Sequence, residues 1–196
     1  MGLREMKAAR TRRQIVEVAL DLVLEQGYDP TTMEQIAERA EVGTSTLYRY
    51  FPSKELLVLE PFTQVLDFAQ RLEQRPADEP LDAALGAVIR ESYPGKAIDR
   101  ERLVALRRIV DHAPGPRARL WDLVNRSTRD LERVIATRAQ LPSDDLTVSL
   151  AARMVLAVYE IVGQAWSAGH TRDSWERAAD RTLAAIARTR LVIPRL

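Results

Sequence analysis

The sequence predicts an all-α fold of about nine helices, with a helix-turn-helix domain over residues 1–57 and a larger helical domain over residues 58–196. Apolar residues recur at three- and four-residue spacing along nearly the whole chain, which is the period of an amphipathic helix. Proline and glycine fall between the periodic segments and separate them. With 196 residues, 46% of them hydrophobic, the chain is long and apolar enough to bury a core.

Three helices are expected in the first domain, and local signals mark their ends. Gly27 is a typical residue after a helix C-terminus. Thr32 precedes the second helix, and Gln35 three residues later completes a capping box. Pro52 stops the third helix. The three helices are expected at residues 11–26, 33–40 and 44–51.

Six further helices are expected in the larger domain, each bounded by caps or breakers. Ser53 caps the first of them. Ser143 caps another, where the two aspartates that follow suit the positive end of a helix. The segments 75–80 and 113–116 are rich in proline and separate neighbouring helices. The six are expected at residues 54–73, 81–92, 99–112, 117–139, 143–168 and 173–191.

The composition argues against several classes of protein. The chain has no cysteine, which excludes disulfides and thiolate metal sites. His112 and His170 are the only histidines, and they lack carboxylate partners at metal-ligand spacing. Phosphate-binding and hydrolase motifs are missing as well. We therefore expect no metal, no cofactor and no enzyme activity, with a small helical enzyme as a remote alternative.

The most apolar stretch, Leu146 to Trp166, includes Arg153 and Glu160. A charge in the middle of a bilayer costs about 2.5–3.5 kcal/mol, so a buried helix explains this stretch better than a membrane span. The N-terminus is polar and basic, unlike a signal peptide. We expect a cytoplasmic protein that does not associate with membranes.

The charge pattern near the N-terminus bears on nucleic-acid binding. Residues 1–60 hold eight Lys and Arg against ten Asp and Glu, which weighs against DNA binding. The first thirteen residues are nevertheless strongly basic, and a local basic arm can bind phosphates on a neutral protein. A frayed, solvated terminus is the alternative. The arm consists of Arg4, Lys7, Arg10, Arg12 and Arg13.

Residues 32–51, with the sequence TMEQIAERAEVGTSTLYRYF, have the pattern of a helix-turn-helix. A small residue, Ala37, stands where the second helix would cross the first closely. Residues 41–43 supply a short turn. An ordinary helical hairpin would fit this window too. The apolar residues expected to lock the two helices are Ile36, Ala40, Val42 and Leu47.

Residues 10–57 together resemble the DNA-binding domain of the TetR/AcrR family over about a quarter of the chain. The resemblance implies a transcriptional regulator, most often a repressor, that binds a palindromic operator as a dimer and responds to a small molecule. The matching residues are Gly27, Tyr28, Thr31, Thr32, Ile36, Ala37, Ala40, Val42, Thr46, Leu47, Tyr48, Tyr50, Phe51, Ser53, Lys54, Glu55 and Leu57.

Two residues depart from the family pattern. Glu41 replaces the usual turn glycine, which costs roughly 1 kcal/mol if that site needs a positive φ. Gly43 replaces the usual capping serine, so the helix cap is expected to shift to Thr44.

The orientation of the third helix follows from Leu47, which must face the core. Helical steps of 100° then turn Ser45, Tyr48 and Arg49 outward, with Thr44 and Thr46 on the flanks. Hydroxyl groups can read base edges in the major groove, and arginine reads guanine or clamps a phosphate.

Phosphate contacts are expected from other positions. Thr32 pairs a hydroxyl with the free amides of a helix N-terminus. By resemblance, Tyr48, Tyr50 and Lys54 contact phosphates. The alternatives are packing of Tyr50 over Leu47 and a solvated Lys54.

The larger domain is expected to bind a hydrophobic or amphipathic effector and to form a homodimer. The last two helices, 143–168 and 173–191, would pair with their copies, or the apolar helix 143–168 would be buried inside the monomer. A helical partner-binding module that has lost DNA binding is the alternative function. The expected effector contacts are Phe62, Phe68, Tyr93, His112, Trp121, Tyr159 and Trp166.

Overall fold

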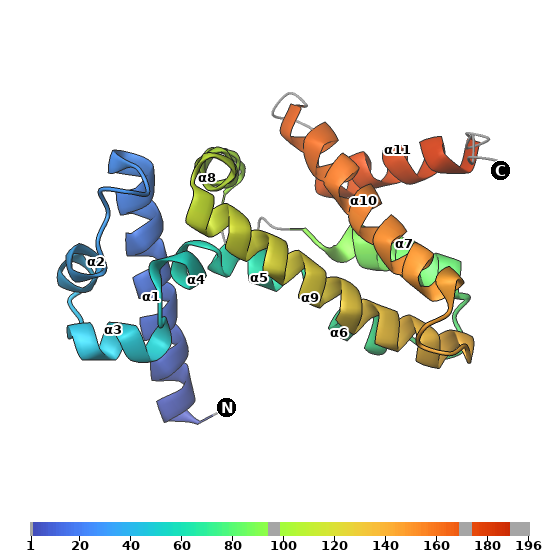
Figure 1. Cartoon of the computed structure of the whole chain (residues 1–196), viewed down its shortest axis with the longest axis horizontal. Coiled ribbons are helices and arrows are strands. Elements are labelled where there is room, and N and C mark those ends of the chain that lie inside the picture. The colour runs from blue at the N-terminus through green and yellow to red at the C-terminus, as the bar shows by residue number, and fades with distance from the viewer. Residues whose placement is uncertain (1, 94–98, 169–173, 189–196) are drawn as a thin grey trace. The chain divides into compact units, whose positions relative to one another are not determined.

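The computed structural model describes residues 2–93, 99–168 and 174–188, and throughout them the regular elements are helices (Figure 1). These residues form two compact units. The first unit holds residues 2–64 and 99–123, and the second holds residues 65–93, 124–168 and 174–188. An all-α fold is therefore confirmed, and the boundary after residue 57 stays a prediction.

The first unit contains the predicted helix-turn-helix and two later segments of the chain. Its helix α1 begins at Leu3 and not at Thr11, because the Glu5 carboxylate accepts a hydrogen bond from the Gly2 amide at 2.8 Å. The elements of this unit are α1 (Leu3–Gln26), α2 (Met33–Arg39), α3 (Thr44–Tyr50), α4 (Lys54–Val58), most of α5 (Glu60–Val65), α8 (Arg100–His112) and the start of α9 (Pro114–Ala139).

An apolar core holds α1, α2 and α3 together. Ala37 is 2% exposed and Leu47 is fully buried, so the two helices approach closely as the sequence predicted. Val42 and Tyr50 pack against this core while partly exposed. The buried members are Ile15, Ala19, Leu22, Met33, Ile36, Ala37, Ala40, Leu47, Phe51 and Leu57.

The second unit packs α7 (Leu81–Glu91), α10 (Leu146–Ala168) and α11 (Trp175–Arg188) against one another, with α6 (Phe68–Glu73) on α7. The indole Nε1 of Trp175 donates to the Ile89 carbonyl at 3.0 Å and ties α11 to α7. Arg138, near the end of α9, donates to the carbonyl oxygens of Leu72 at 3.0 Å and Pro76 at 2.7 Å. These bonds fix the end of α9 against the end of α6 and the segment that follows it.

The expectation of one helix over residues 54–73 is wrong, since α4, α5 and α6 replace it. Pro61 has no N–H to donate to the Leu57 carbonyl, so the first helix cannot continue. Farther on, Leu66 lies between α5 and α6. Its carbonyl oxygen accepts a hydrogen bond from the Ser127 hydroxyl of α9.

Two other helix starts differ from expectation. Helix α9 begins at Pro114, because proline suits the first helical position, where its missing N–H costs nothing. Ser143 does not cap helix α10, which begins at Leu146; the Asp145 carboxylate accepts instead from the Thr147 amide at 2.7 Å. The expected start of the last helix at Asp173 lies outside the described residues, as does its end at Leu191.

By length and composition alone, α10 could cross a membrane. Its Arg153 and Glu160 are exposed, and its buried residues pack on α7 and α11. These contacts bury one side of α10, while Leu150, Met154 and Ile161 on the rest of the helix remain exposed.

Candidate nucleic-acid interface

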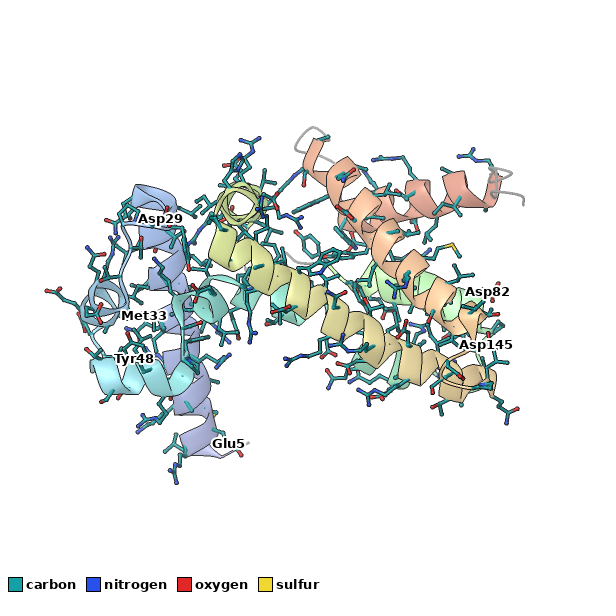
Figure 2. The ribbon with its side chains drawn as sticks, in the orientation of Figure 1. Glu5, Asp29, Met33, Tyr48, Asp82 and Asp145 are labelled. Carbon is teal, nitrogen blue, oxygen red and sulfur yellow. The ribbon has the colours of Figure 1, made fainter. Side chains whose placement is uncertain are left out.

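The polar side of α3 faces outward and its apolar side faces the core. Leu47 is 0% exposed, whereas Tyr48 is 43% exposed (Figure 2 labels Tyr48 on α3). The exposed side chains on this helix also include Thr44, Ser45 and Arg49, while Thr46 and Tyr50 are half-buried. A helix in this orientation can present hydroxyl and guanidinium groups to the floor of a DNA groove.

The turn between α2 and α3 depends on a left-handed residue. Glu41 has φ 54°, the conformation for which glycine is the usual residue. Its amide donates to the Glu38 carbonyl at 3.0 Å, and the Val42 amide donates to Ala37 at 3.0 Å. The turn therefore keeps its geometry although glycine is replaced by glutamate.

The expected shift of the helix cap to Thr44 is wrong. Gly43 is the N-cap of α3, with an extended backbone at φ −64° and ψ 142°, and Thr44 is the first helical residue. The Gly43 carbonyl accepts from the Leu47 amide at 3.0 Å. A glycine makes no side-chain cap, so the amides of Thr44 and Ser45 have no acceptor within the helix, whereas the Thr46 amide donates to the Gly43 carbonyl at 2.8 Å.

The start of α2 has the predicted capping box. The Thr32 hydroxyl accepts from the Gln35 amide at 3.2 Å, and the Gln35 side-chain oxygen accepts from the Thr32 amide at 3.0 Å. Gln26 also donates to that oxygen at 3.1 Å, which anchors the box to α1. The hydroxyl proton of the exposed Thr32 remains able to donate to a phosphate.

Lys54 lies at the start of α4 with its ammonium group half-buried. Nζ donates to the carbonyl oxygens of Tyr28 and Thr31, each at 2.7 Å. It also lies 4.0 Å from the centre of the Tyr28 ring. Burial lowers the pKa of Lys54 below its ordinary value. The alternative of a solvated lysine is therefore wrong, and one N–H of the three remains for a phosphate.

A tyrosine–carboxylate pair next to Lys54 was not anticipated from the sequence. The Tyr28 hydroxyl donates to Glu55 Oε1 at 2.7 Å. Burial, followed by this bond to a carboxylate, raises the pKa of Tyr28. Burial alone would raise the pKa of Glu55, but the bond from Tyr28 and backbone hydrogen bonding lower it overall. The pair joins the loop after α1 to the start of α4.

Arg12 is engaged inside the domain and does not belong to the basic arm. Its guanidinium donates to both Glu60 carboxylate oxygens, at 2.9 and 2.8 Å, and to the Tyr50 carbonyl at 3.3 Å. It also lies 4.3 Å from the centre of the Phe51 ring. Arg12 thus fixes the end of α3 against α1 and α5. Arg12 stands one position before the end of the basic arm, and nothing in the local sequence distinguishes it from its neighbours.

The remaining arm residues lie on helical backbone, so the alternative of a frayed terminus is wrong. Arg4, Lys7, Arg10 and Arg13 are all exposed on α1. Arg39 of α2, by contrast, is paired at 2.7 Å with Glu25, which lies on the C-terminal half of α1. The acidic total of residues 1–60 therefore does not describe the charge beside α3, where exposed cations gather.

Four of the expected effector residues belong to an aromatic cluster in the second unit. Phe68 and Tyr159 have ring centres 5.2 Å apart, and Tyr93 lies 5.9 Å from Trp166. Trp175 joins the cluster, 5.1 Å from Tyr159 and 6.0 Å from Trp166. Trp175, the first residue of α11, was not among the expected effector residues.

The other three expected effector residues lie in the first unit, outside this cluster. Phe62 is 8% exposed, whereas Trp121 is 66% exposed, which does not suit an enclosed pocket. His112 is exposed, and its Nδ1 lies 2.7 Å from the Arg108 carbonyl oxygen. Within the described stretches, which omit His170, no group of three or more His, Asp or Glu could hold a metal.

Comparison with known proteins agrees with this geometry. The model of the family "Bacterial regulatory proteins, tetR family" matches residues 15–60, which include α2, α3 and α4. The regulator TcmR of Streptomyces glaucescens, an HTH-type transcriptional regulator, is 37% identical over 192 residues, covering 94% of this chain and 81% of that protein.

Solved structures share the fold at lower identity. FadR of Bacillus subtilis, solved with stearoyl-CoA, has a TM-score of 0.61 and 19% identity over 88% of this chain and 96% of that one. NalD of Pseudomonas aeruginosa, a repressor of a multidrug efflux pump, has a TM-score of 0.58 and 21% identity over 93% and 96%. The helix-turn-helix has the expected geometry, and TcmR aligns with 94% of this chain. The chain therefore belongs to the TetR family of bacterial regulatory proteins and is a transcriptional regulator.

Proposed function

We propose that the protein represses transcription by binding a palindromic operator as a homodimer, and that a small hydrophobic effector releases it. The observation that carries this proposal is the orientation of α3, with Leu47 buried and Ser45, Tyr48 and Arg49 exposed. In a helix-turn-helix the second helix lies in the major groove, and the first crosses the backbone.

The residues divide by the part of DNA they would contact. Hydroxyl groups and the guanidinium on the outer side of α3 are placed to read base edges. Groups at helix starts and the tyrosines are placed to bind phosphates. The first set is Thr44, Ser45, Thr46 and Arg49, and the second is Thr32, Tyr48, Tyr50 and Lys54.

The operator can be found by selecting bound duplexes from a random-sequence library with the purified full chain. We expect a palindromic site whose half-sites are about 34 Å apart or a related spacing. Ser45→Ala and Arg49→Ala should each change the selected sequence or lower affinity at particular base pairs. Gln70→Ala, a change at an exposed residue of the second unit, should leave selection unchanged.

Two results would contradict the proposal. Affinity that does not fall with salt would be inconsistent with phosphate contacts. A wild-type protein that binds no duplex at low ionic strength would favour a partner-binding module whose helix-turn-helix has lost DNA binding.

The effector site is proposed beside the aromatic cluster of the second unit. Phe68, Trp166 and Trp175 are buried there, and Tyr93 and Tyr159 are half-buried, which suits an apolar ligand with a few polar groups. The stearoyl-CoA bound by FadR is an example of such chemistry in a protein of this fold.

Fluorescence tests this placement, because the chain has three tryptophans and two of them lie in the cluster. Trp121→Phe leaves emission from Trp166 and Trp175 alone. Titration of this variant with stearoyl-CoA and a panel of aromatic and aliphatic compounds should find a ligand that changes the emission and releases the operator. A ligand that releases the operator without changing the emission would place the site elsewhere.

A further inference from the structure

A basic cleft of about 480 Å³ lies between the first turns of α1 and the end of α3. Arg4, Lys7, Ala8 and Thr11 line it from α1, and Arg49 and Tyr50 line it from α3. The C-terminal end of α3 meets the N-terminal half of α1 here, where the two helices cross (Figure 1).

The α1 residues of the cleft share one helical face. Positions 4, 7, 8 and 11 follow the spacing that brings side chains together on a helix. Since α1 is helical from Leu3, Arg4 and Lys7 point with Thr11 toward α3 and are not spread around a flexible chain. Arg49 approaches from the opposite wall, so three cationic groups surround one space.

These cations are available to an external anion. Among the described residues, Arg4, Lys7 and Arg49 form no salt bridge, whereas Arg12 and Arg39 are each paired with a glutamate. The small side chain of Ala8 leaves room between the cations, and the Thr11 hydroxyl adds a hydrogen-bond donor.

We propose that this cleft binds a backbone phosphate of operator DNA just outside the base pairs that α3 reads. The inference rests on the proposed function. Arg49 belongs both to the outer side of α3 and to the cleft, so the cleft continues the proposed DNA surface without a break. Three cations around an open space favour a polyanion backbone, where each neutralised phosphate releases counterions.

The test compares two double variants on two duplexes. Arg4→Ala with Lys7→Ala removes two cleft cations. Arg10→Ala with Arg13→Ala removes two cations from the same helix that do not line the cleft. One duplex is the selected operator trimmed to its core, and the other carries extended flanks. All four side chains are exposed, and circular dichroism verifies that α1 remains folded in both variants.

The cleft variant should bind the extended duplex on the order of tenfold more weakly than wild type, and its plot of log affinity against log salt should be shallower by about one to two units per protomer. The loss of affinity and the change in salt slope should both be smaller on the core duplex. The control variant should show much smaller changes in affinity and salt slope on the extended duplex. Equal losses for the two double variants, or no loss for the cleft variant, would overturn the inference while leaving operator binding intact.

Competition by inorganic phosphate is a further test of the cleft. If it competes with the extended duplex no better than chloride at the same ionic strength, the cleft binds backbone phosphate within DNA. Saturable competition by phosphate, lost only in the cleft variant, would instead define a small-anion site and overturn the inference. A wild-type protein that binds neither duplex would refute the proposed function, and this inference with it.

Discussion

The ammonium group of Lys54 donates a hydrogen bond to the Tyr28 carbonyl at 2.7 Å and lies 4.0 Å from the centre of the same residue's ring. Lys54 therefore holds the loop that leads into α2. We expect Lys54→Ala to lower the free energy of unfolding by about 1–3 kcal/mol, because it removes charge-assisted bonds to two carbonyls. Urea denaturation of the variant measures the loss.

The same variant tests the phosphate contact. If Lys54 also binds DNA, affinity should fall for all sequences and the salt slope should decrease by about one unit. Lys54→Met keeps the packing of the side-chain stem and serves as the matched control. Weaker binding with an unchanged salt slope would assign Lys54 to loop positioning alone.

The Tyr28–Glu55 pair should make the free energy of unfolding depend on pH in both the acid and the alkaline range. The pKa of Glu55 is lowered from 4.5, so its contribution is present above that value and is lost as pH falls through the folded-state pKa. The pKa of Tyr28 is raised from 10.0, so its contribution is present below pH 10.0 and is lost as pH rises further.

Replacing Tyr28 by phenylalanine should therefore flatten both limbs of the stability profile. Denaturation midpoints measured across the pH range provide the readout, and Tyr48→Phe is the control because Tyr48 is exposed. Identical acid and alkaline limbs in Tyr28→Phe and wild type would show that the pair contributes nothing to the pH dependence.

Replacing Glu41, whose backbone is left-handed, by glycine should stabilise the fold. We expect Glu41→Gly to raise the free energy of unfolding by about 0.5–1 kcal/mol, because relief of backbone strain exceeds the added entropy of the unfolded chain. Glu38→Gly is a control of opposite sign. It lies exposed within α2, where glycine costs about 1 kcal/mol. Destabilisation by both changes would contradict the strain assigned to Glu41.

Arg12 and Glu60 should be energetically coupled. Arg12→Ala and Glu60→Gln, made singly and together, should give a coupling energy of about 1 kcal/mol in a double-mutant cycle followed by denaturation. The paired geometry, with both Glu60 oxygens accepting, supports a value near the upper end for a partly exposed pair. Additive effects would mean that Arg12 acts only through Phe51 and the Tyr50 carbonyl.

The outer face of α10 should hold the proposed dimer together. Leu146 is 79% exposed, Leu150 is 66% exposed and Met154 is 51% exposed, although all three are apolar. Only 28% of the most apolar window of this helix is buried, so burial within the monomer does not account for it. We expect Leu150→Glu with Met154→Glu to yield a monomer by analytical ultracentrifugation and to weaken operator binding.

Ala77→Glu, also at an exposed position of the second unit, should leave the dimer intact. A double variant that sediments like wild type would exclude this face of α10 from the interface.

Helix periodicity predicted the fold and the orientation of α3, because the burial of Leu47 follows from local spacing. It failed where a distant residue decides the structure. The break at Leu66 depends on Ser127, which lies 61 positions along the chain. The extension of α1 to Leu3 was missed because polar residues carry no apolar period, and its stabilising contact is Glu5 with the Gly2 amide.

Individual candidate residues were harder to assign than the motif that contains them. Arg12 looked equivalent to its basic neighbours, and only the position of Glu60 separates it from them. Aromatic type alone did not distinguish Trp121, which is exposed, from Trp166 and Trp175, which contact each other. Such distinctions depend on tertiary contacts that no local pattern encodes.

The early start of α1 also has a consequence for promoter architecture. The turns between Leu3 and Thr11 add about 12 Å of stiff helix, at 1.5 Å per residue. A rigid extension of this kind holds the cleft at a fixed distance from the base pairs that α3 contacts, whereas a disordered tail would allow that distance to vary. Duplexes shortened from the flank by single base pairs should therefore lose affinity at one defined length, so regulated promoters need a fixed length of duplex beside each half-site but no fixed sequence there.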